Sequence, residues 1–433
     1  MSALQVLEVP PEPVDFWVAR LDAVLAELAA VVADCTDVPD AVRIDRIDRL
    51  ERLRAVTAAA QAAECVRFAQ SQVAEQLSLD VHPRAVGRGV ADQIALACRI
   101  SPVAGSRRLG VARSLWFDLP QTFAQLTNGD LREAVAEVVV TETRHLDSAT
   151  RRQVDGEVVS AGINRLGLRA AAACVRRIAY RADPHGYLER GRTERKLRRV
   201  GCRSAPDTMA VLTGYLPVEQ GVACYAALRR HTDGVVATGD TRTRDQIMAD
   251  TLVERLTGQA RAGDVAVEVQ LLVPLEALTK PGNDQSATLQ GYGPLPLGIA
   301  RDIVATSRGQ KWWRRLFTAP PLGRDSGPLI GGDPNRRRFD GFVARLISAR
   351  DQTCRDPYCD ASIRHHDHIT RHVDGGKTNL PGGRGVCARG NYVREMPGWR
   401  VEVTSDGLAG APHATVTTTP TGHRDLSEAP QPP

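Results

Sequence analysis

Apolar side chains recur at helical spacing through most of the first 200 residues. Residues 14–33 carry one such stripe, and a second, longer helix is expected to begin at Pro39-Asp40. Further helices are expected up to about residue 146 and over 166–182. Charged residues lie among the apolar ones, so the spacing predicts helices packed on helices with ion pairs on the outside.

The spacing changes after about residue 200. The segment "DTMAVLTGYLP" (207–217) predicts a strand or one arm of a hairpin, and "DVAVEVQLLVP" (264–274) alternates as a strand does. Helices are expected at 217–230 and 243–257, and another at 297–306 after the Gly/Pro loop "LQGYGPLP". The middle of the chain is therefore expected to mix helices with a few strands.

A chain of 433 residues is too long for one ordinary core. We expect an α+β, mainly helical fold with a small C-terminal module. The expected divisions are a helical domain at 14–200, its α+β continuation at 201–340, the module at 341–403, and a disordered tail at 404–433. The tail is rich in Thr, Pro and Gly and has almost no apolar periodicity.

The beginning of the chain, "MSALQVLEVPPEPVDF", has no basic segment followed by an apolar run, so no signal peptide is expected. The most apolar helical stretch, 24–33, is about half the length of a membrane span. We therefore expect a cytoplasmic protein that does not contact a membrane. The net charge of +5 permits a polyanionic partner without requiring one.

Of nine cysteines, six stand singly in apolar, mostly helical surroundings and are expected to be small buried hydrophobic residues. These are Cys35, Cys65, Cys98, Cys174, Cys202 and Cys224. The other three are Cys354, Cys359 and Cys387. The first two form a tight pair with a proline between them, which is half of a tetrahedral zinc site, and Cys387 would be a third ligand. A fourth ligand would stand at position 390, which is Gly390.

Four of the ten histidines lie between residues 365 and 372. Within this cluster Asp367 and His368 are adjacent, and in a regular strand their side chains would point to opposite faces. A carboxylate oxygen suits a hard divalent cation, and a neutral imidazole can take a proton from water near pH 7. Gly375-Gly376 then forms a loop, and a short helix from about 387 to 396 carries Asn391.

The segments "RDQTCRDPYCDASIRHHDHI", "GGKTN" and "GVCARGNYVREMPGW" resemble the HNH endonucleases. The preceding region, roughly 40–320, looks like the domain of unknown function that often precedes HNH modules in actinobacterial proteins. "QIMADTLVERLTG", "VEVQLLVPLEAL" and "GYGPLP" carry that second resemblance.

The resemblance implies a ββα-metal nuclease module that hydrolyses DNA phosphodiester bonds. His368 would be the general base, and Asp367 and Asn391 would hold Mg²⁺ or Mn²⁺. Cys354, Cys359 and Cys387 would hold a structural Zn²⁺. Five side chains are placed as nucleic-acid contacts: Arg336, Arg337, Arg338, Arg364 and His366.

The chain departs from the family pattern at two positions. The asparagine that orients the catalytic histidine is expected at 382, where Gly382 stands, and Asn379 would replace it only in a rebuilt loop. With Gly390 at the fourth zinc position, water or His372 is left to complete a weaker site. Gly382 therefore puts the nuclease activity in question, and Gly390 puts zinc binding in question.

Simpler interpretations stay open for other residues. His365, His366 and His372 are, one by one, expected at the surface, on phosphate or packed in a loop. The segment "ERGRTERKLRRV" (189–200) is most simply a solvated face, and "KWWRRLF" (311–317) an apolar anchor. The leading function is a DNA endonuclease, with a homo-oligomer formed through the helical region as one option. The alternatives are a catalytically decayed DNA-binding protein of mobile-element origin and a partner-binding helical region with a relic module.

Overall fold

The computed structural model describes most of the chain. The described residues are 16–33, 37–261, 271–272, 287–289, 293–306, 339, 341–407 and 411–430. The described part is mainly helical, with four small antiparallel sheets, as expected for an α+β protein. None of the described helices is both long and apolar enough to cross a membrane.

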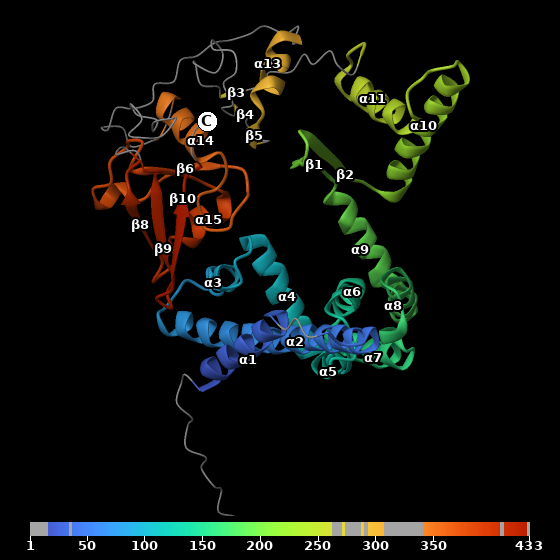
Figure 1. Cartoon of the computed structure of the whole chain (residues 1–433). Helices are drawn as coiled ribbons and strands as arrows, with labels where there is room; N and C mark the ends of the chain where they lie inside the picture. Colours follow the sequence, from blue (N-terminus) through green and yellow to red (C-terminus); the bar gives the residue numbers. More distant parts are fainter. Residues whose placement is uncertain are drawn as a thin grey trace, which may run out of the picture.

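Two helices run along the base of the molecule (Figure 1). They are α1 (Phe16–Ala33) and the long α2 (Asp40–Ser78). The expected amphipathic stripe of α1 is present, but none of its residues is buried, and Leu25 is 63% exposed. The stripe continues through Ile44 and Ile47 of α2, which are exposed as well. Only the second half of α2, from Ala55 onward, enters the core.

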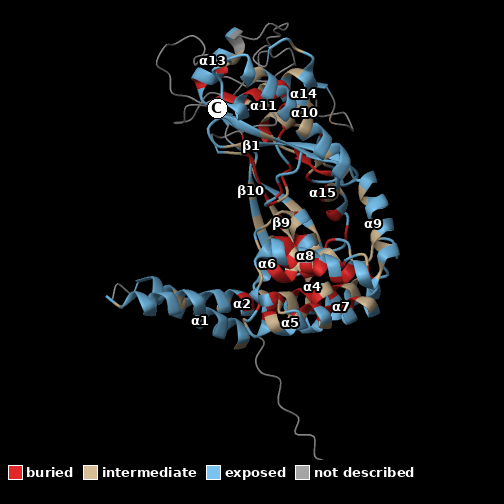
Figure 2. Cartoon of the chain, turned by 90° about the vertical axis from the view of Figure 1, so that its right-hand side faces the viewer, coloured by how far each residue is buried: buried red, intermediate tan, exposed pale blue. Residues whose placement is uncertain are grey.

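Six further helices pack around that half of α2. They are α3 (Val90–Ala97), α4 (Pro102–Asp118), α5 (Pro120–Thr127), α6 (Glu133–Thr143), α7 (Ser148–Ser160) and α8 (Leu168–Ala182). Their apolar side chains form the largest described core, seen as the buried part of α4 to α8 in Figure 2. Asp155 of α7 is fully buried, and its carboxylate accepts hydrogen bonds from the backbone of Gln121 and Thr122. These bonds satisfy amides at the start of α5 that have no partner within their helix.

Beyond the bundle, α9 (Pro184–Lys196) leads to a hairpin and a helix pair (Figure 1). The hairpin is β1 (Arg199–Ala205) and β2 (Met209–Tyr215), followed by α10 (Val218–Ala237) and α11 (Arg244–Thr257). The expected hairpin arm and the two expected helices are thus confirmed. Cys202 and Cys224 lie here and are exposed, so the expectation that they are buried was wrong, whereas Cys65 and Cys174 are buried as expected.

The remaining described strands of the middle region form a three-stranded sheet with one helix. These are β3 (Leu271–Leu272), β4 (Ala287–Leu289), β5 (Gly293–Leu295) and α13 (Leu297–Thr306). The helix confirms the expectation at 297–306. Most of the strand expected at 264–274, the segment 311–317 and Cys35 lie outside the described residues.

The C-terminal module consists of a helix, a hairpin, a second helix and a sheet. Its elements are α14 (Gly341–Asp351), β6 (His365–His368), β7 (Gly383–Val386), α15 (Ala388–Val393), β8 (Arg400–Ser405), β9 (Ala414–Thr418) and β10 (Arg424–Glu428). Strand β9 is the centre of an antiparallel sheet with β8 and β10. The expectation of a disordered tail from 404 was therefore wrong for residues 411–430. Ala414, Thr415 and Thr417 of this central strand are buried.

Candidate metal centre and histidine site

Three cysteines meet at one end of the β6–β7 hairpin. The sulfur atoms of Cys354, Cys359 and Cys387 lie within 4.8 Å of one another, and all three residues are buried. A left-handed turn at Tyr358 (φ 61°) and a backbone hydrogen bond from Cys359 to Asp356 (3.1 Å) fold the first two cysteines toward each other. Cys387 approaches from the N-terminus of α15.

The cysteine cluster fits a zinc ion. The sulfurs of Cys359 and Cys387 are 4.0 Å apart, and two thiolates on one tetrahedral zinc, each about 2.3 Å from the metal, would be about 3.8 Å apart. Backbone amides of Cys387 and Gly390 donate to the sulfurs of Cys354 (3.2 Å) and Cys387 (3.3 Å). Hydrogen bonds from the other two cysteines lower the pKa of Cys387, while hydrogen bonding within the cluster raises that of Cys354. The cluster thus favours at least one thiolate, the form that binds metal.

His372 does not complete this cluster. Its ring lies edge-on to that of His368, with 5.4 Å between the ring centres, and it is not among the donor atoms grouped with the sulfurs. The alternative that His372 is the fourth zinc ligand was therefore wrong for this arrangement of the chain.

The hairpin that carries the histidine cluster is packed between two helices. Strand β6 pairs with β7 without a register shift, so Asp367 stands opposite Arg384 and His368 opposite Gly383. The two side chains accordingly point to opposite faces. A Cβ at position 383 would lie 2.6 Å from the Ile347 side chain, so glycine is what lets α14 approach this face. Asp367 faces α15.

His368 is held by the side chains of Thr378 and Phe339. Its Nε2 lies 2.8 Å from Oγ1 of the buried Thr378, and its ring lies against Phe339, with 4.4 Å between the ring centres. Burial, followed by the repulsion of His372, lowers the pKa of His368 below its ordinary value. The imidazole is therefore neutral at pH 7, as a general base must be.

Asp367 is engaged by two arginines. Arg394, which follows α15, donates from Nη1 to Asp367 Oδ2 and also to the carbonyl oxygen of His368. The fully buried Arg384 lies with Nε 3.8 Å from the same carboxylate oxygen. Asn391 is three residues before Arg394 and so shares its helix face. A divalent cation on Asp367 Oδ2 would compete with Arg394, whose positive charge also opposes the approach of a cation to the carboxylate.

The loop at Gly382 is closed by Asn379. The side-chain oxygen of Asn379 accepts a hydrogen bond from the Gly382 amide (2.8 Å). A Cβ at position 382 would lie 2.8 Å from that oxygen and 2.7 Å from the Lys377 carbonyl oxygen. Asn379 therefore caps its own loop, and the neighbouring Thr378 is the residue that contacts His368.

The residues expected to contact nucleic acid have different surroundings. Arg364 is exposed at the start of β6. His366 Nε2 instead lies 2.8 Å from Ser348 Oγ of α14, and burial lowers its pKa. This packing engages one of the two ring nitrogens, Nε2, with the protein itself. Arg336, Arg337 and Arg338 lie outside the described residues.

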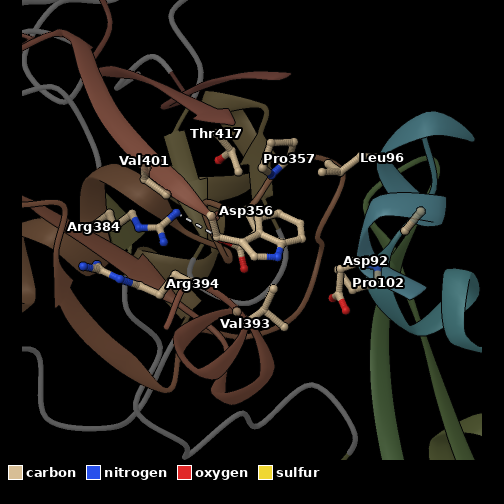
Figure 3. A pocket seen from close by; sticks show the side chains of 13 residues that line it. Asp92, Leu96, Pro102, Asp356, Pro357, Arg384, Val393, Arg394, Val401 and Thr417 are labelled. Atoms are coloured by element: carbon tan, nitrogen blue, oxygen red, sulfur yellow. Dashed lines mark hydrogen bonds and ion pairs between the residues drawn. The ribbon is translucent and has the colours of Figure 1, made fainter. Parts of the chain in front are cut away.

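The module also contacts the helical bundle beside the cysteine cluster. Arg389 of α15 forms two hydrogen bonds of 2.7 Å to the carboxylate of Asp92 on α3, and another of 2.5 Å to Ser106. A small cavity of about 30 Å³ lies between the two parts, with Asp356 near Arg384 on the module side and Asp92 across it (Figure 3). It is too small for an organic ligand, which needs roughly 300 Å³ or more.

Sequence reasoning missed four side chains of this site. Thr378, Arg384 and Arg394 surround the Asp-His pair, and Asp356 lies beside the cysteines. The position of Asp356 between two candidate ligands was a visible signal. The others lie ten or more residues from their partners, and only the folded chain brings them together.

Comparisons with known proteins identify the larger part of the chain. A family model described as "Domain of unknown function (DUF222)" matches residues 47–305. A comparison with curated proteins and another with solved structures found no match. The matched segment contains α3 to α11 and ends within α13, before the cysteine and histidine cluster begins.

Proposed function

The chain belongs to the DUF222 family, and from that premise we propose that its C-terminal module is a DNA endonuclease of the HNH kind with His368 as general base. The helical region would dock the DNA or regulate cleavage. The observation that carries the proposal is the hydrogen bond of His368 with Thr378 at the end of a β hairpin packed on a helix. A strand–strand–helix unit with a neutral histidine at the strand end is the arrangement that the sequence resemblance implies.

In the proposed mechanism, His368 acts in the tautomer that carries its proton on Nε2, facing Thr378. With Nε2–H donating to Thr378 Oγ1, the lone pair remains on Nδ1, which takes the proton from the attacking water. The low pKa keeps that lone pair free at neutral pH. The exposed Arg364, on the same face of the strand two residues before His366, would bind phosphate.

The oxygen donors of Asp367 and Asn391 suit Mg²⁺ or Mn²⁺ in chemical type. Such an ion would stabilise the charge on the phosphate and the leaving oxygen. Arg394 competes for the same carboxylate, so its positive charge would weaken the binding of the ion by these residues. The proposed enzyme therefore requires a higher Mg²⁺ concentration than a site without this arginine.

The contact of Arg394 with Asp367 also favours a second candidate function. If Arg394 stays in place as the cation of the site, the module binds DNA without cutting it. Three arginine-rich segments and the exposed Arg364 would supply phosphate contacts whose strength falls as salt rises.

A plasmid-nicking assay with Mg²⁺ or Mn²⁺ tests the proposal. We expect His368→Ala to slow nicking at least about 100-fold, because general-base catalysis contributes about that much or more. His365→Ala is the matched control, since His365 is exposed on the same strand, and it should stay within about twofold. Nicking by His368→Ala at the wild-type rate would contradict the proposed base.

The variant Arg394→Gln separates the two candidates. It removes the positive charge but keeps a donor for the carbonyl oxygen of His368. For the enzyme we expect nicking at lower Mg²⁺ concentration than in wild type. A wild type that binds DNA in a salt-dependent way but nicks with neither metal favours the second candidate, and a gain of nicking in Arg394→Gln would identify Arg394 as the block.

A further inference from the structure

Gly390 leaves open the place where a fourth zinc ligand would stand, and another side chain fills it. A Cβ at position 390 would overlap Oδ2 of Asp356, and its three nearest atoms all belong to the Asp356 carboxyl group. Gly390 is itself buried and on the first turn of α15, next to Cys387. The missing side chain and the approaching carboxylate therefore occupy one space.

The carboxylate is also close to the sulfurs. Asp356 Oδ2 lies 3.7 Å from Cys354 Sγ. A tetrahedral zinc with a sulfur at about 2.3 Å and an oxygen at about 2.0 Å separates those two ligands by about 3.5 Å. The donor atoms that lie within 4.8 Å of one another are the three sulfurs alone, so ligation by Asp356 requires its carboxylate to move closer to the other sulfurs.

Arg384 holds the other oxygen of Asp356. Its Nη1 donates to Oδ1 at 3.0 Å, and its side chain is fully buried. Oδ2 is therefore the oxygen turned toward Cys354. Figure 3 shows the Asp356–Arg384 pair among the residues that line the cavity. A ligating carboxylate whose second oxygen accepts a hydrogen bond has its orientation fixed, which strengthens metal binding.

We propose that Asp356 is the fourth ligand of a zinc ion held by Cys354, Cys359 and Cys387, in the place that Gly390 leaves open. The site is then complete, with three thiolates and one carboxylate. This inference does not depend on the proposed nuclease activity, because a structural zinc stabilises the module whether or not it cuts DNA.

The competing explanation is purely structural. Asp356 would then only pair with Arg384 and accept a hydrogen bond from the Cys354 thiol. Substitution of Asp356 would disturb the fold in either case, so loss of stability alone does not separate the two explanations. The test therefore has to measure metal binding directly, through an affinity or a spectrum that depends on the ligands.

The experiment measures Zn²⁺ affinity of the full chain by competition with a chelator, and the visible spectrum of the Co²⁺-loaded chain. We expect Asp356→Asn to weaken Zn²⁺ binding at least tenfold and to change the Co²⁺ bands. The matched control is Asp360→Asn, in the same turn but exposed, which should stay within twofold. Nicking is not part of the readout, so failure here is separate from failure of the nuclease proposal.

A ligand exchange removes the ambiguity about folding. Asp356→Ala and the double variant Asp356→Ala/Gly390→Cys both remove the Asp356–Arg384 ion pair. Both also remove the carboxyl group that occupies the space at position 390, which the new cysteine fills in the double variant. We expect the double variant to regain the Zn²⁺ affinity that the single variant loses, with Co²⁺ bands moved to longer wavelength as a thiolate replaces an oxygen.

Two results would overturn the proposal. The first is an Asp356→Asn chain whose Zn²⁺ affinity and Co²⁺ spectrum match those of wild type. The second is a fully reduced wild-type chain that binds no Zn²⁺ in the competition.

Discussion

The helical bundle and the C-terminal module bury different kinds of side chain. In the bundle, helices α4 to α8 meet through Val, Leu, Ile and Ala, with few buried charges among them. In the module, the described apolar clusters are small, and buried arginines and cysteines occupy much of the interior. Apolar contacts stabilise under most solution conditions, whereas thiolates and buried ion pairs depend on metal and pH. The two parts should therefore respond differently to the same treatment.

Arg350 illustrates how the module is held. Its guanidinium pairs with Asp351 and donates to the carbonyl oxygens of Leu380 (2.6 Å) and Gly383 (2.7 Å). Asp351 in turn accepts from the Gly385 amide (2.7 Å). One buried ion pair thus joins α14 to β7 and to the loop before it.

The largest expected effect is that of removing zinc. Structural zinc contributes about 10–16 kcal/mol in zinc-finger peptides, more than a whole domain usually has in reserve. We expect chelation, or Cys354→Ser, to abolish hydrogen-exchange protection in β6, β7 and α15 while α6 and α8 stay protected. Cys174→Ser, in the bundle core, is the control and should leave the module protected. Equal protection of the module with and without zinc would contradict this difference between the parts.

The next largest effect is expected from breaking the buried pair. Arg350→Met removes the closer partner of the buried Asp351 and leaves it Arg355 at 3.7 Å. The change should destabilise the module by at most about 3–5 kcal/mol in denaturant unfolding, the cost of leaving a buried charge unpaired. Arg345→Met, exposed on the same helix, should change stability by at most about 0.5 kcal/mol. Similar effects of the two variants would show that the pair does not hold the module.

A smaller effect is expected from acid. His413 is buried, with Nε2–H donating to the Pro381 carbonyl oxygen (2.9 Å), and burial lowers its pKa from 6.5 to about 4. The unfolded chain binds this proton at higher pH than the folded chain, so stability is lost as pH falls from 6.5 toward about 4. The shift corresponds to roughly 3 kcal/mol.

Thermal unfolding of the module across this pH range measures the acid effect. His413→Asn should lose less stability on acidification than wild type. His423→Asn, exposed in the turn between β9 and β10, should behave like wild type. A wild-type module whose unfolding temperature does not depend on pH in this range would contradict the assignment.

The sequence predicted the helices of the bundle better than the strands of the module, because the bundle is held by apolar packing and the module by contacts between distant residues. A helix with an apolar stripe can be read from spacing alone, and α6, α8, α10 and α11 were found in this way. The stripe of α1 shows the limit of that reasoning, since spacing does not say whether a partner covers it. Strands β9 and β10 were missed because β9 is rich in Thr and β10 in polar residues, so neither shows a clear apolar alternation. Their place in the fold depends on distant contacts, such as that of Arg355 with the Ser427 carbonyl oxygen.

In the candidate site, too, spacing predicted some residues but not the contacts that depend on the folded chain. Residue type and spacing predicted that the three cysteines form one cluster, and the structure brings their sulfurs together. Spacing also placed Asp367 and His368 on opposite faces of a strand, as found. It could not predict Arg394 on Asp367 or Thr378 on His368, because these contacts depend on how α15 and the 377–382 loop fold back onto β6.

The pH dependence of the nicking rate tests the role of His368 most directly. With single-turnover rates measured from about pH 5.5 to about pH 8.5, we predict that wild type keeps its rate at pH values below the ordinary histidine pKa, because burial lowers the pKa of His368. Thr378→Val should reduce the rate about tenfold, since the imidazole is no longer fixed. A wild-type profile that His368→Ala reproduces in both shape and rate would contradict the account.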